Sequence, residues 1–216
     1  MSKITVIITA HQDRGWIDDA ILSAKNQTFS DYDIILTSDG NPSLAKFAKK
    51  HSIKFCYTKK GNWGTAVNNA VKTVRSEWIK VLHDDDLLKP NCLGDLYNSR
   101  GDASLVYANV EIFTESSSRI YKPPARIELK DMLLNNPINW AGVMFKRDAL
   151  TEVGGFDPLL QFANDKGLYL SMLSADHKFV YCDKVVASFR KHDTQLTGHQ
   201  PEARRKDLIY LSNKYK

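Results

Sequence analysis

The chain has 216 residues, of which 43% are hydrophobic and 25% are charged. This length and composition are typical of one globular domain, with a core large enough to fold without disulfides, and they exclude a disordered chain. The three cysteines, Cys56, Cys92 and Cys182, are widely spaced and suggest neither a disulfide framework nor a zinc ribbon.

We expect a cytoplasmic protein that is soluble or peripherally associated with a membrane. The first residues turn polar too soon for a signal peptide, and no apolar run approaches the ~20 residues that cross a bilayer. Residues 178–216 hold nine Lys/Arg against four Asp/Glu, a surplus that equals the net charge of +5. This basic end suits a membrane surface, a nucleic acid, a diphosphate or a solvated helix face. The absence of interleaved aromatic residues argues against nucleic acid as a partner.

The first hundred residues alternate between strand and helix patterns. This alternation predicts βαβ units and a mostly parallel sheet flanked by helices, with ligands bound beyond the carboxyl ends of the strands. The predicted strands are residues 3–10, 32–37, 53–57 and 78–82, and the predicted helices are 16–25, 43–51 and 65–74.

The second half is less regular and predicts a small additional antiparallel sheet. We expect strands at 104–113, 119–122, 142–145, 178–182 and 185–190, and helices at 128–134, 163–173 and 202–214. Since no segment reads as a linker, we treat residues 1–216 as one domain. Its donor-binding half is about 1–100, its acceptor and catalytic half about 101–200, and its C-terminal helix about 201–216.

Three consecutive acids, Asp84, Asp85 and Asp86, follow the apolar strand 78–82. Adjacent carboxylates repel one another and raise each other's pKa, a cost that a divalent cation removes. Oxygen ligands of this kind suit Mg²⁺ or Mn²⁺, and Mg²⁺ usually completes its shell with substrate phosphates. The cluster therefore predicts a metal site for a phosphorylated ligand, with a solvated acidic turn as the alternative.

Two further segments lie just past predicted strand ends. Asp39 stands in a Ser-Asp-Gly turn, where a carboxylate can accept the imide N–H of uracil or thymine, or simply shape the turn. Gly61-Asn62-Trp63-Gly64 opens a predicted helix, whose backbone amides suit a phosphate or ribose. Because parallel strands end at one edge, we expect these segments to line one crevice with Ala10 and His11.

In their order and spacing, these motifs resemble the family 2 inverting glycosyltransferases, which have the GT-A fold. The resemblance covers about residues 3–195 and includes the helix start at Gly64. Its other parts read TVIITAH, QTFSDYDIILTSDG, WIKVLHDDDLLKP, GVMFKRDALTEVGGFDPLL, ANDKGLYLSML and ASFRKHDTQLTG.

The resemblance implies a role for each matching residue. On the donor side, Asp39 binds the base with Ala10 and His11 beside it, and Gly64 lies at the phosphate or ribose. Asp84 holds the ribose or the metal shell, Asp85 and Asp86 ligate Mn²⁺ or Mg²⁺, and Arg190 and His192 form an Arg-x-His pattern that reaches the diphosphate or metal. Asp165 is the general base that takes the proton of the acceptor hydroxyl.

Three positions differ from the usual family pattern. Ser38 and His83 stand where many relatives have acids, and Asn164 replaces the usual glutamate before Asp165. Because the Gln-x-x-Arg-Trp motif of processive synthases is missing, transfer of a single sugar is expected. We also expect the polar loop 193–200 to close over the donor and to bring His199 to the site.

The function predicted is metal-dependent transfer of one sugar from a nucleotide-sugar donor to a glycan or other hydroxyl acceptor, with inversion. A single carboxylate at Asp39 favours UDP- or dTDP-linked donors. The alternatives are a sugar nucleotidyltransferase and a nucleotide-sugar-binding module whose catalysis has decayed. The sequence leaves open the donor sugar, the acceptor, the metal, the oligomeric state and whether the chain is a module of a longer protein.

Overall fold

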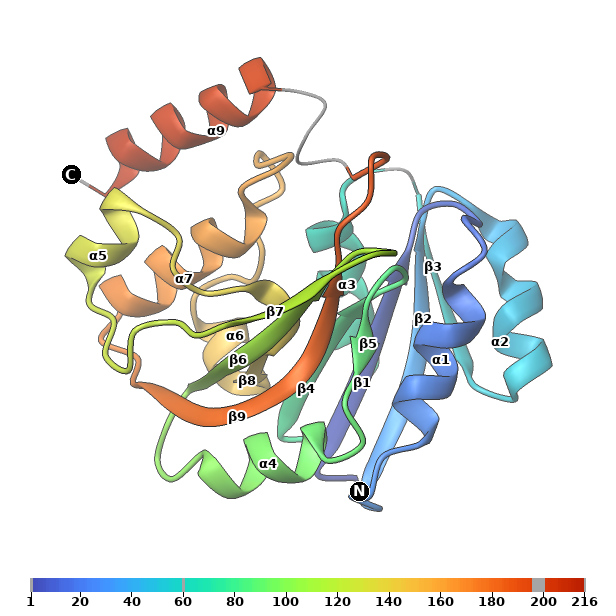
Figure 1. The fold of residues 1–216 in the computed structure, drawn as a ribbon. Helices are drawn as coiled ribbons and strands as arrows, with labels where there is room; N and C mark the ends of the chain where they lie inside the picture. The colour runs from blue at the N-terminus through green and yellow to red at the C-terminus, as the bar shows by residue number, and fades with distance from the viewer. Residues whose placement is uncertain (1, 60, 196–200, 216) are drawn as a thin grey trace.

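The computed structural model describes residues 2–59, 61–195 and 201–215 as α/β layers around one sheet (Figure 1). The first half follows the predicted alternation closely. Its strands are β1 (Ile4–Ala10), β2 (Tyr32–Asp39), β3 (Lys54–Thr58), β4 (Trp78–His83) and β5 (Leu87–Leu88). Its helices are α1 (Ile17–Lys25), the 3₁₀ turn η1 (Pro42–Leu44), α2 (Ala45–His51), α3 (Trp63–Val71) and α4 (Cys92–Ser99).

The second half adds strands to the same sheet. Its strands are β6 (Leu105–Phe113), β7 (Ser118–Tyr121), β8 (Val143–Lys146) and β9 (Phe179–Arg190). Its helices are α5 (Leu129–Leu134), η2 (Trp140–Gly142), α6 (Arg147–Glu152), α7 (Asn164–Ser174) and α9 (Pro201–Lys214). The elements β5, α4 and α6 are absent from the sequence prediction, and β5, with two residues, is too short to show a period.

The strand order is β3-β2-β1-β4-β8-β6-β9-β5, with β7 paired to β6. The pairs among β1 to β4 are parallel, and β8 joins this group by antiparallel pairing to both β4 and β6. The antiparallel strands are thus continuous with the central sheet and do not form a separate small one. All seven residues of β1 are buried, as expected for a strand with helices over both faces.

The two strands predicted at 178–182 and 185–190 are one strand, β9, which pairs in parallel with β6. Ala108 pairs with Cys182 and Asn109 with Val185, so two residues of β9 bulge out of the ladder. The Asn109 amide donates a hydrogen bond of 2.8 Å to the carboxylate of Asp183 inside that bulge. A bulge interrupts the alternation of side chains, which is why the sequence pattern indicates a break.

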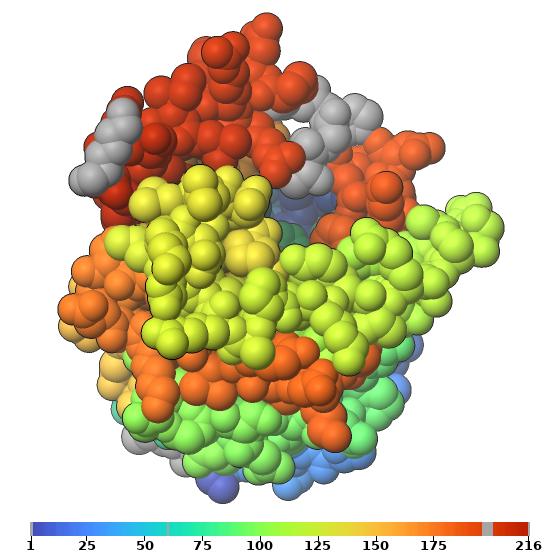
Figure 2. All heavy atoms as spheres, turned by 60° about the vertical axis from the view of Figure 1, so that its left-hand side comes forward, coloured from blue at the N-terminus to red at the C-terminus, as the bar shows by residue number. Residues whose placement is uncertain are grey.

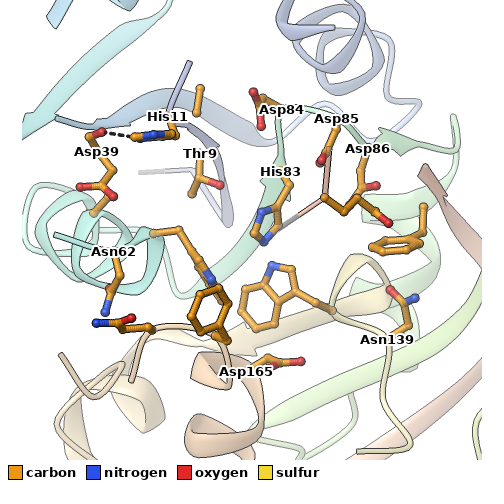
Figure 3. Close-up of a pocket in the computed structure, with 18 of the residues that line it drawn as sticks. Thr9, His11, Asp39, Asn62, His83, Asp84, Asp85, Asp86, Asn139 and Asp165 are labelled. Carbon is orange, nitrogen blue, oxygen red and sulfur yellow. Dashed lines mark hydrogen bonds between the residues drawn. The ribbon is translucent and has the colours of Figure 1, made fainter. Parts of the chain in front are cut away.

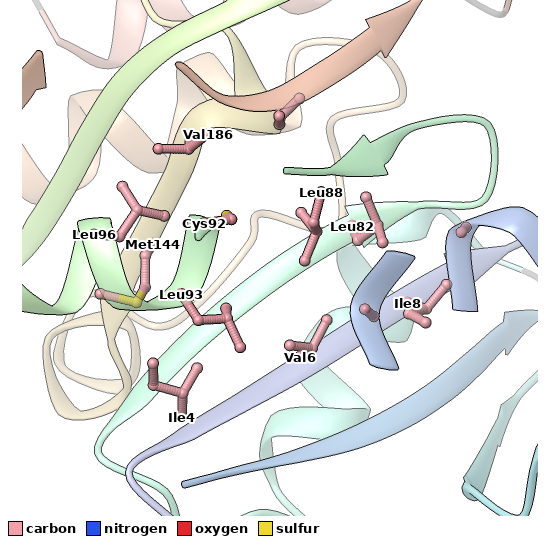
Figure 4. Close-up of a cluster of buried hydrophobic side chains, with 14 of the residues drawn as sticks. Ile4, Val6, Ile8, Leu82, Leu88, Cys92, Leu93, Leu96, Met144 and Val186 are labelled. Atoms are coloured by element: carbon pink, nitrogen blue, oxygen red, sulfur yellow. The ribbon is translucent and has the colours of Figure 1, made fainter. Parts of the chain in front are cut away.

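Hydrophobic clusters on the two faces of the sheet fix the helices to it. Helices α1, α2 and α4 cover one face, where Ile4 and Val6 of β1 lie near Leu93 of α4 (Figure 4). Helices α3, α6 and α7 cover the other face. Among the described residues, no helix is both long and apolar enough to cross a membrane.

Candidate active site

A cleft of about 970 Å³ opens beyond the carboxyl ends of β1, β2 and β4, as predicted for a parallel sheet. Residues from both halves of the chain line it (Figure 3). In the space-filling view it appears as a hollow between the yellow α5 segment and the red C-terminal segments (Figure 2). Seven of the residues predicted for the site line the cleft: Ala10, His11, Asp39, Asp84, Asp85, Asp86 and Asp165.

Asp39 closes the donor-side wall at the end of β2. Its Oδ1 accepts a hydrogen bond of 2.6 Å from the backbone N–H of Gly61, which ties the loop before α3 to β2. Its backbone carbonyl lies 3.1 Å from Nδ1 of His11, at the end of β1. The Asp39 carboxylate and the exposed ring of His11 therefore border one corner of the cleft.

The acidic turn after β4 lies against β1. The backbone N–H of Asp84 donates to Thr9 O over 3.0 Å, so the turn continues the β1–β4 ladder. Burial, reinforced by the neighbouring charge of Asp85, raises the pKa of Asp84 to about 7, and Arg14 opposes this shift. Within the described part of the chain, the buried Oδ2 of Asp84 has no hydrogen-bond partner. This oxygen is shielded from solvent and is an acceptor that the described protein groups leave unused.

Asp86 differs from its two neighbours because it ties two strands together. It is 2% exposed, and its Oδ1 accepts a hydrogen bond of 2.9 Å from the backbone N–H of Arg190 at the end of β9. Burial raises its pKa well above the ordinary value. Although Asp86 lines the cleft, its Oδ1 already accepts the hydrogen bond from the backbone of Arg190.

Arg14 lies beside the acidic turn, and our sequence reasoning missed it. Its Nη1 is 3.5 Å from Asp85 Oδ2, and its Nη2 is 4.0 Å from Asp84 Oδ1. The Arg14 side chain is 14% exposed and lines the cleft. The sequence places an arginine four residues after β1, but nothing in that pattern shows that it turns back toward β4.

His192 and Arg190 approach Asp85 from the end of β9. His192 Nε2 lies 3.0 Å from Asp85 Oδ2, and Arg190 Nε donates to the backbone carbonyl of Asp85 over 3.0 Å. The Arg190 guanidinium packs between the rings of Trp16 and Phe113, at 5.0 and 4.7 Å from their centroids. The Arg-x-His pattern thus reaches the acidic turn, although neither side chain is among the residues that line the cleft.

Asp85 and His192 lie next to each other, and both are residue types that bind divalent metal ions. No cluster of three or more His, Cys, Asp or Glu suited to a metal ion occurs among residues 2–59, 61–195 and 201–215. Mg²⁺ is usually bound through one or two carboxylates together with substrate phosphates, and the Asp85 carboxylate is a ligand of that kind. The donor set therefore fits a metal that arrives with its diphosphate.

Asp165 lies on the opposite wall, in the first turn of α7. Its Oδ2 accepts a hydrogen bond of 2.7 Å from the amide of Asn136, in the segment after α5. Burial raises the pKa of Asp165, while hydrogen bonds from the Lys166 backbone and from Asn136 oppose that shift. A half-buried carboxylate with a raised pKa, at the edge of a cleft, has the properties of a general base.

Three rings form the floor between the two walls. Trp63 lies 4.9 Å from His83 and 5.0 Å from Trp140, measured between ring centroids, and all three line the cleft. Burial lowers the pKa of His83, so the ring is neutral at pH 7. Trp63 therefore packs against its neighbouring rings and also has a surface on the cleft.

Gly64 does not line the cleft among the described residues. A Cβ there would lie 2.8 Å from Asn164 Oδ1 and 2.8 Å from Phe156 Cβ. The glycine thus allows α3 to pack closely on the segment before α7. The predicted lid is described only as far as Gln195, so its residues 196–200, including His199, lie outside the described residues.

Comparison with known proteins identifies the family. Residues 5–153 match the family model described as glycosyl transferase family 2. The chain belongs to this family. The match includes Asp39 and Asp84–Asp86 and ends before Asp165 and His192, so in this family 2 chain these last two residues lie beyond the matched segment.

Relatives and solved structures agree with that assignment. An uncharacterised glycosyltransferase of Rickettsia typhi is 27% identical over 211 residues, which cover 90% of this chain and 66% of that protein. S. aureus TarS 1–349 in complex with UDP-GlcNAc has a TM-score of 0.77 at 14% identity, covering 97% of this chain and 65% of that one. The mannosyltransferase PcManGT from Pyrobaculum calidifontis, in complex with GDP-Man and Mn²⁺, has a TM-score of 0.68 at 15% identity, covering 98% and 63%.

These structural likenesses confirm the predicted GT-A fold of the family 2 chain. The chain spans just under two thirds of the length of these three proteins. Their bound donors and metal belong to those proteins. For this chain, the comparisons establish the fold and the family but not the reaction.

Proposed function

We propose that this chain transfers one sugar from a nucleotide-sugar donor to an acceptor hydroxyl, with a divalent cation and with inversion. The donor half is about residues 1–100, and the acceptor and catalytic half about 101–200. UDP- and dTDP-linked sugars are the favoured donors because Asp39 offers a carboxylate to a pyrimidine imide. The structures of TarS with UDP-GlcNAc and of PcManGT with GDP-Man support a nucleotide-sugar donor as a class.

The observation that carries the proposal is the placement of carboxylates on two walls of one cleft. Asp39, Asp84 and Asp85 stand on the wall built by the donor half, and Asp165 stands on the wall built by the second half. An inverting transfer needs this separation, because the base must act on the face of the sugar opposite the departing diphosphate.

Each wall has its own task in this proposal. Asp39 accepts a hydrogen bond from the base, and the unpartnered oxygen of Asp84 receives a ribose hydroxyl. Arg14 brings positive charge toward the diphosphate and adds to its electrostatic stabilisation. Asp165, held by Asn136, takes the proton of the attacking hydroxyl, which typically accelerates a reaction by ~10²–10⁴-fold.

Asp85 and His192 would hold the metal together with the diphosphate, and Asp86 would support them through its bond to Arg190. When bound, Mn²⁺ or Mg²⁺ would stabilise the negative charge that develops on the leaving diphosphate. The complex of PcManGT with Mn²⁺ supports the metal as a class of cofactor.

The position of Asn164 favours an active enzyme over a decayed binding module. Asn164 is fully buried, and it is Asp165, not Asn164, that lines the cleft. The change from the usual family glutamate therefore falls on a packing position beside Gly64 and leaves the proposed base in place.

The first experiment is a screen of UDP-, dTDP- and GDP-sugars, with Mn²⁺, with Mg²⁺ and with EDTA. Binding is measured by calorimetry and slow donor hydrolysis by release of the nucleoside diphosphate. We expect one donor to bind and to be hydrolysed only with metal, and Asp85→Ala to lose both. Binding without hydrolysis would favour the decayed module, and no binding of any nucleotide sugar would refute the proposed function.

A further inference from the structure

The C-terminal helix α9 lies along α7, the helix that carries Asp165 (Figure 1). Asp207 and Leu211 of α9, together with Tyr215 just after the helix, are spaced by four residues and form one stripe that faces α7. Asp207 contacts the segment at the start of α7, Leu211 lies next to Gly167, and the Tyr215 hydroxyl is 2.5 Å from that of Ser171. The basic C-terminal end, for which the sequence left several partners open, is therefore packed against the second wall of the cleft along this stripe.

Asp207 makes the most specific contact of the stripe. Its Oδ2 accepts hydrogen bonds from three successive backbone N–H groups, those of Gln161, Phe162 and Ala163, at 3.0, 2.7 and 3.0 Å. The residue is 6% exposed. Hydrogen bonds to a carboxylate are roughly twice as strong as neutral ones, and this oxygen lies where the dipole of α7 favours negative charge.

The segment held by Asp207 belongs to the cleft. Gln161 and Phe162 line it, and Asp165 follows two residues after Ala163, in the first turn of α7. Ala163 is the N-cap of α7, and its side chain makes no capping hydrogen bond. Asp207 therefore does not cap α7; it holds the three backbone N–H groups that lead into the helix, up to and including that of its N-cap.

A second contact fixes the beginning of the same segment. The Tyr210 hydroxyl and the Lys214 ammonium of α9 each donate to Oδ2 of Asp157, both over 2.9 Å. The segment from Asp157 to Ala163 is thus held at both ends by α9. On its other side, Asp165 is held by Asn136.

We propose that Asp207 is a positioning residue for Asp165 and for the acceptor-side segment 161–163. In this proposal, α9 holds in place the wall of the cleft that carries Asp165, and it is not merely an appended helix. The inference rests on the proposed function, because it assigns Asp165 the role of base. A displacement of about 1 Å at a reacting group costs up to ~10²-fold in rate, so the three hydrogen bonds have a direct kinetic consequence.

The test uses Asp207→Asn, which keeps the shape of the side chain and removes its charge, and Asp207→Glu, which keeps the charge. Tyr215→Phe is the matched control, since it removes the contact at the far end of the same stripe. Hydrogen exchange at amides 161–163, donor affinity by calorimetry and the rate of donor hydrolysis are measured on each folded variant.

For Asp207→Asn we expect amide exchange at 161–163 to rise, and hydrolysis to slow by about tenfold to a hundredfold with donor affinity unchanged. Asp207→Glu should recover part of the rate, and Tyr215→Phe should stay near the wild type. If Asp207→Asn does not fold, the same comparison is made between Asp207→Glu and the wild type, and a displaced carboxylate should again slow hydrolysis without weakening donor binding.

Three results would overturn the positioning role: unchanged exchange at 161–163, faster exchange with an unchanged rate, or an equal loss of rate in Tyr215→Phe. A wild-type protein that hydrolyses no nucleotide sugar would instead remove the proposed function, and with it the base that Asp207 positions. The exchange measurement would still show whether Asp207 holds the segment, so the two failures are distinguishable.

Discussion

His192 and Asp85, separated by 107 positions in the sequence, meet through a contact of 3.0 Å between Nε2 and Oδ2. The other ring nitrogen of His192 lies 2.8 Å from Thr194 Oγ1, which fixes the orientation of the ring. Two potential metal ligands from distant strands are thus joined at the edge of the cleft, and a partner behind one of them sets its direction.

We predict that His192→Ala weakens metal-dependent donor binding by at least about tenfold, because one of the two protein ligands is lost. Thr194→Val should have a smaller effect, since it removes only the group that orients the ring. Calorimetry with the donor in Mn²⁺ and in EDTA measures both variants. Equal donor affinity of His192→Ala and the wild type in Mn²⁺ would exclude His192 from the metal site.

The pH dependence of hydrolysis should report Asp165. Because a base acts in its deprotonated form, the rate falls as pH falls through the pKa of Asp165, which burial raises above the ordinary value of 3.8. Asn136→Ala removes a hydrogen bond that favours the charged form, so the acid limb of the profile should move to higher pH. The charged groups that act on Asp165 are Arg204 of α9 and Lys166 of α7, Tyr169 is a neutral neighbour because burial raises its pKa, and all three stay in place.

Asn135→Ala, at the exposed neighbouring position, is the control for this profile and should leave the acid limb where it is. Asp165→Asn should lower the rate by ~10²–10⁴-fold while donor affinity stays the same. An acid limb that persists in the residual activity of Asp165→Asn would assign the titration to another group.

Arg14 and Asp39 should separate recognition of the diphosphate from recognition of the base. Arg14→Gln is expected to weaken binding of UDP much more than binding of uridine, because the guanidinium lies beside the acidic turn and not beside Asp39. Asp39→Ala should weaken both ligands. Lys46→Gln, in an exposed ion pair with Asp13, is the control and should change neither. Calorimetry with UDP and with uridine measures both affinities. A loss of uridine binding in Arg14→Gln would contradict the assignment of Arg14 to the diphosphate.

Gly64 should be intolerant of a side chain. A Cβ at this position meets Asn164 and Phe156 at 2.8 Å, so Gly64→Ala should lower the free energy of unfolding by about 1–3 kcal/mol. Gly94, inside α4, has no atom within 4 Å of its would-be Cβ, and Gly94→Ala should raise stability by up to about 1 kcal/mol. Chemical denaturation of the two variants gives both values, and equal effects would show that helix propensity, not packing, determines the result.

The features that depend on local order along the chain can be predicted from the amino-acid sequence. The hydrophobic periodicity of the first half predicts its parallel strands. Acidic residues that follow a strand end predict the crevice, because parallel strands end at one edge of the sheet. Asp39, Asp84, Asp85 and Asp165 line the cleft as predicted. A pattern of this kind depends on neighbours within a few residues, which the sequence shows directly.

Contacts between residues that are far apart in the sequence are known only from the folded structure. The proximity of Arg14 to Asp85, the bond from Asn136 to Asp165 and the bonds from residues 161–163 to Asp207 join residues that are 29 to 71 positions apart. No local period encodes such contacts, because they follow from how helices pack on a sheet whose register has already been set. The folded chain also showed that Gly64 is a packing position and that the C-terminal helix lies beside the proposed base.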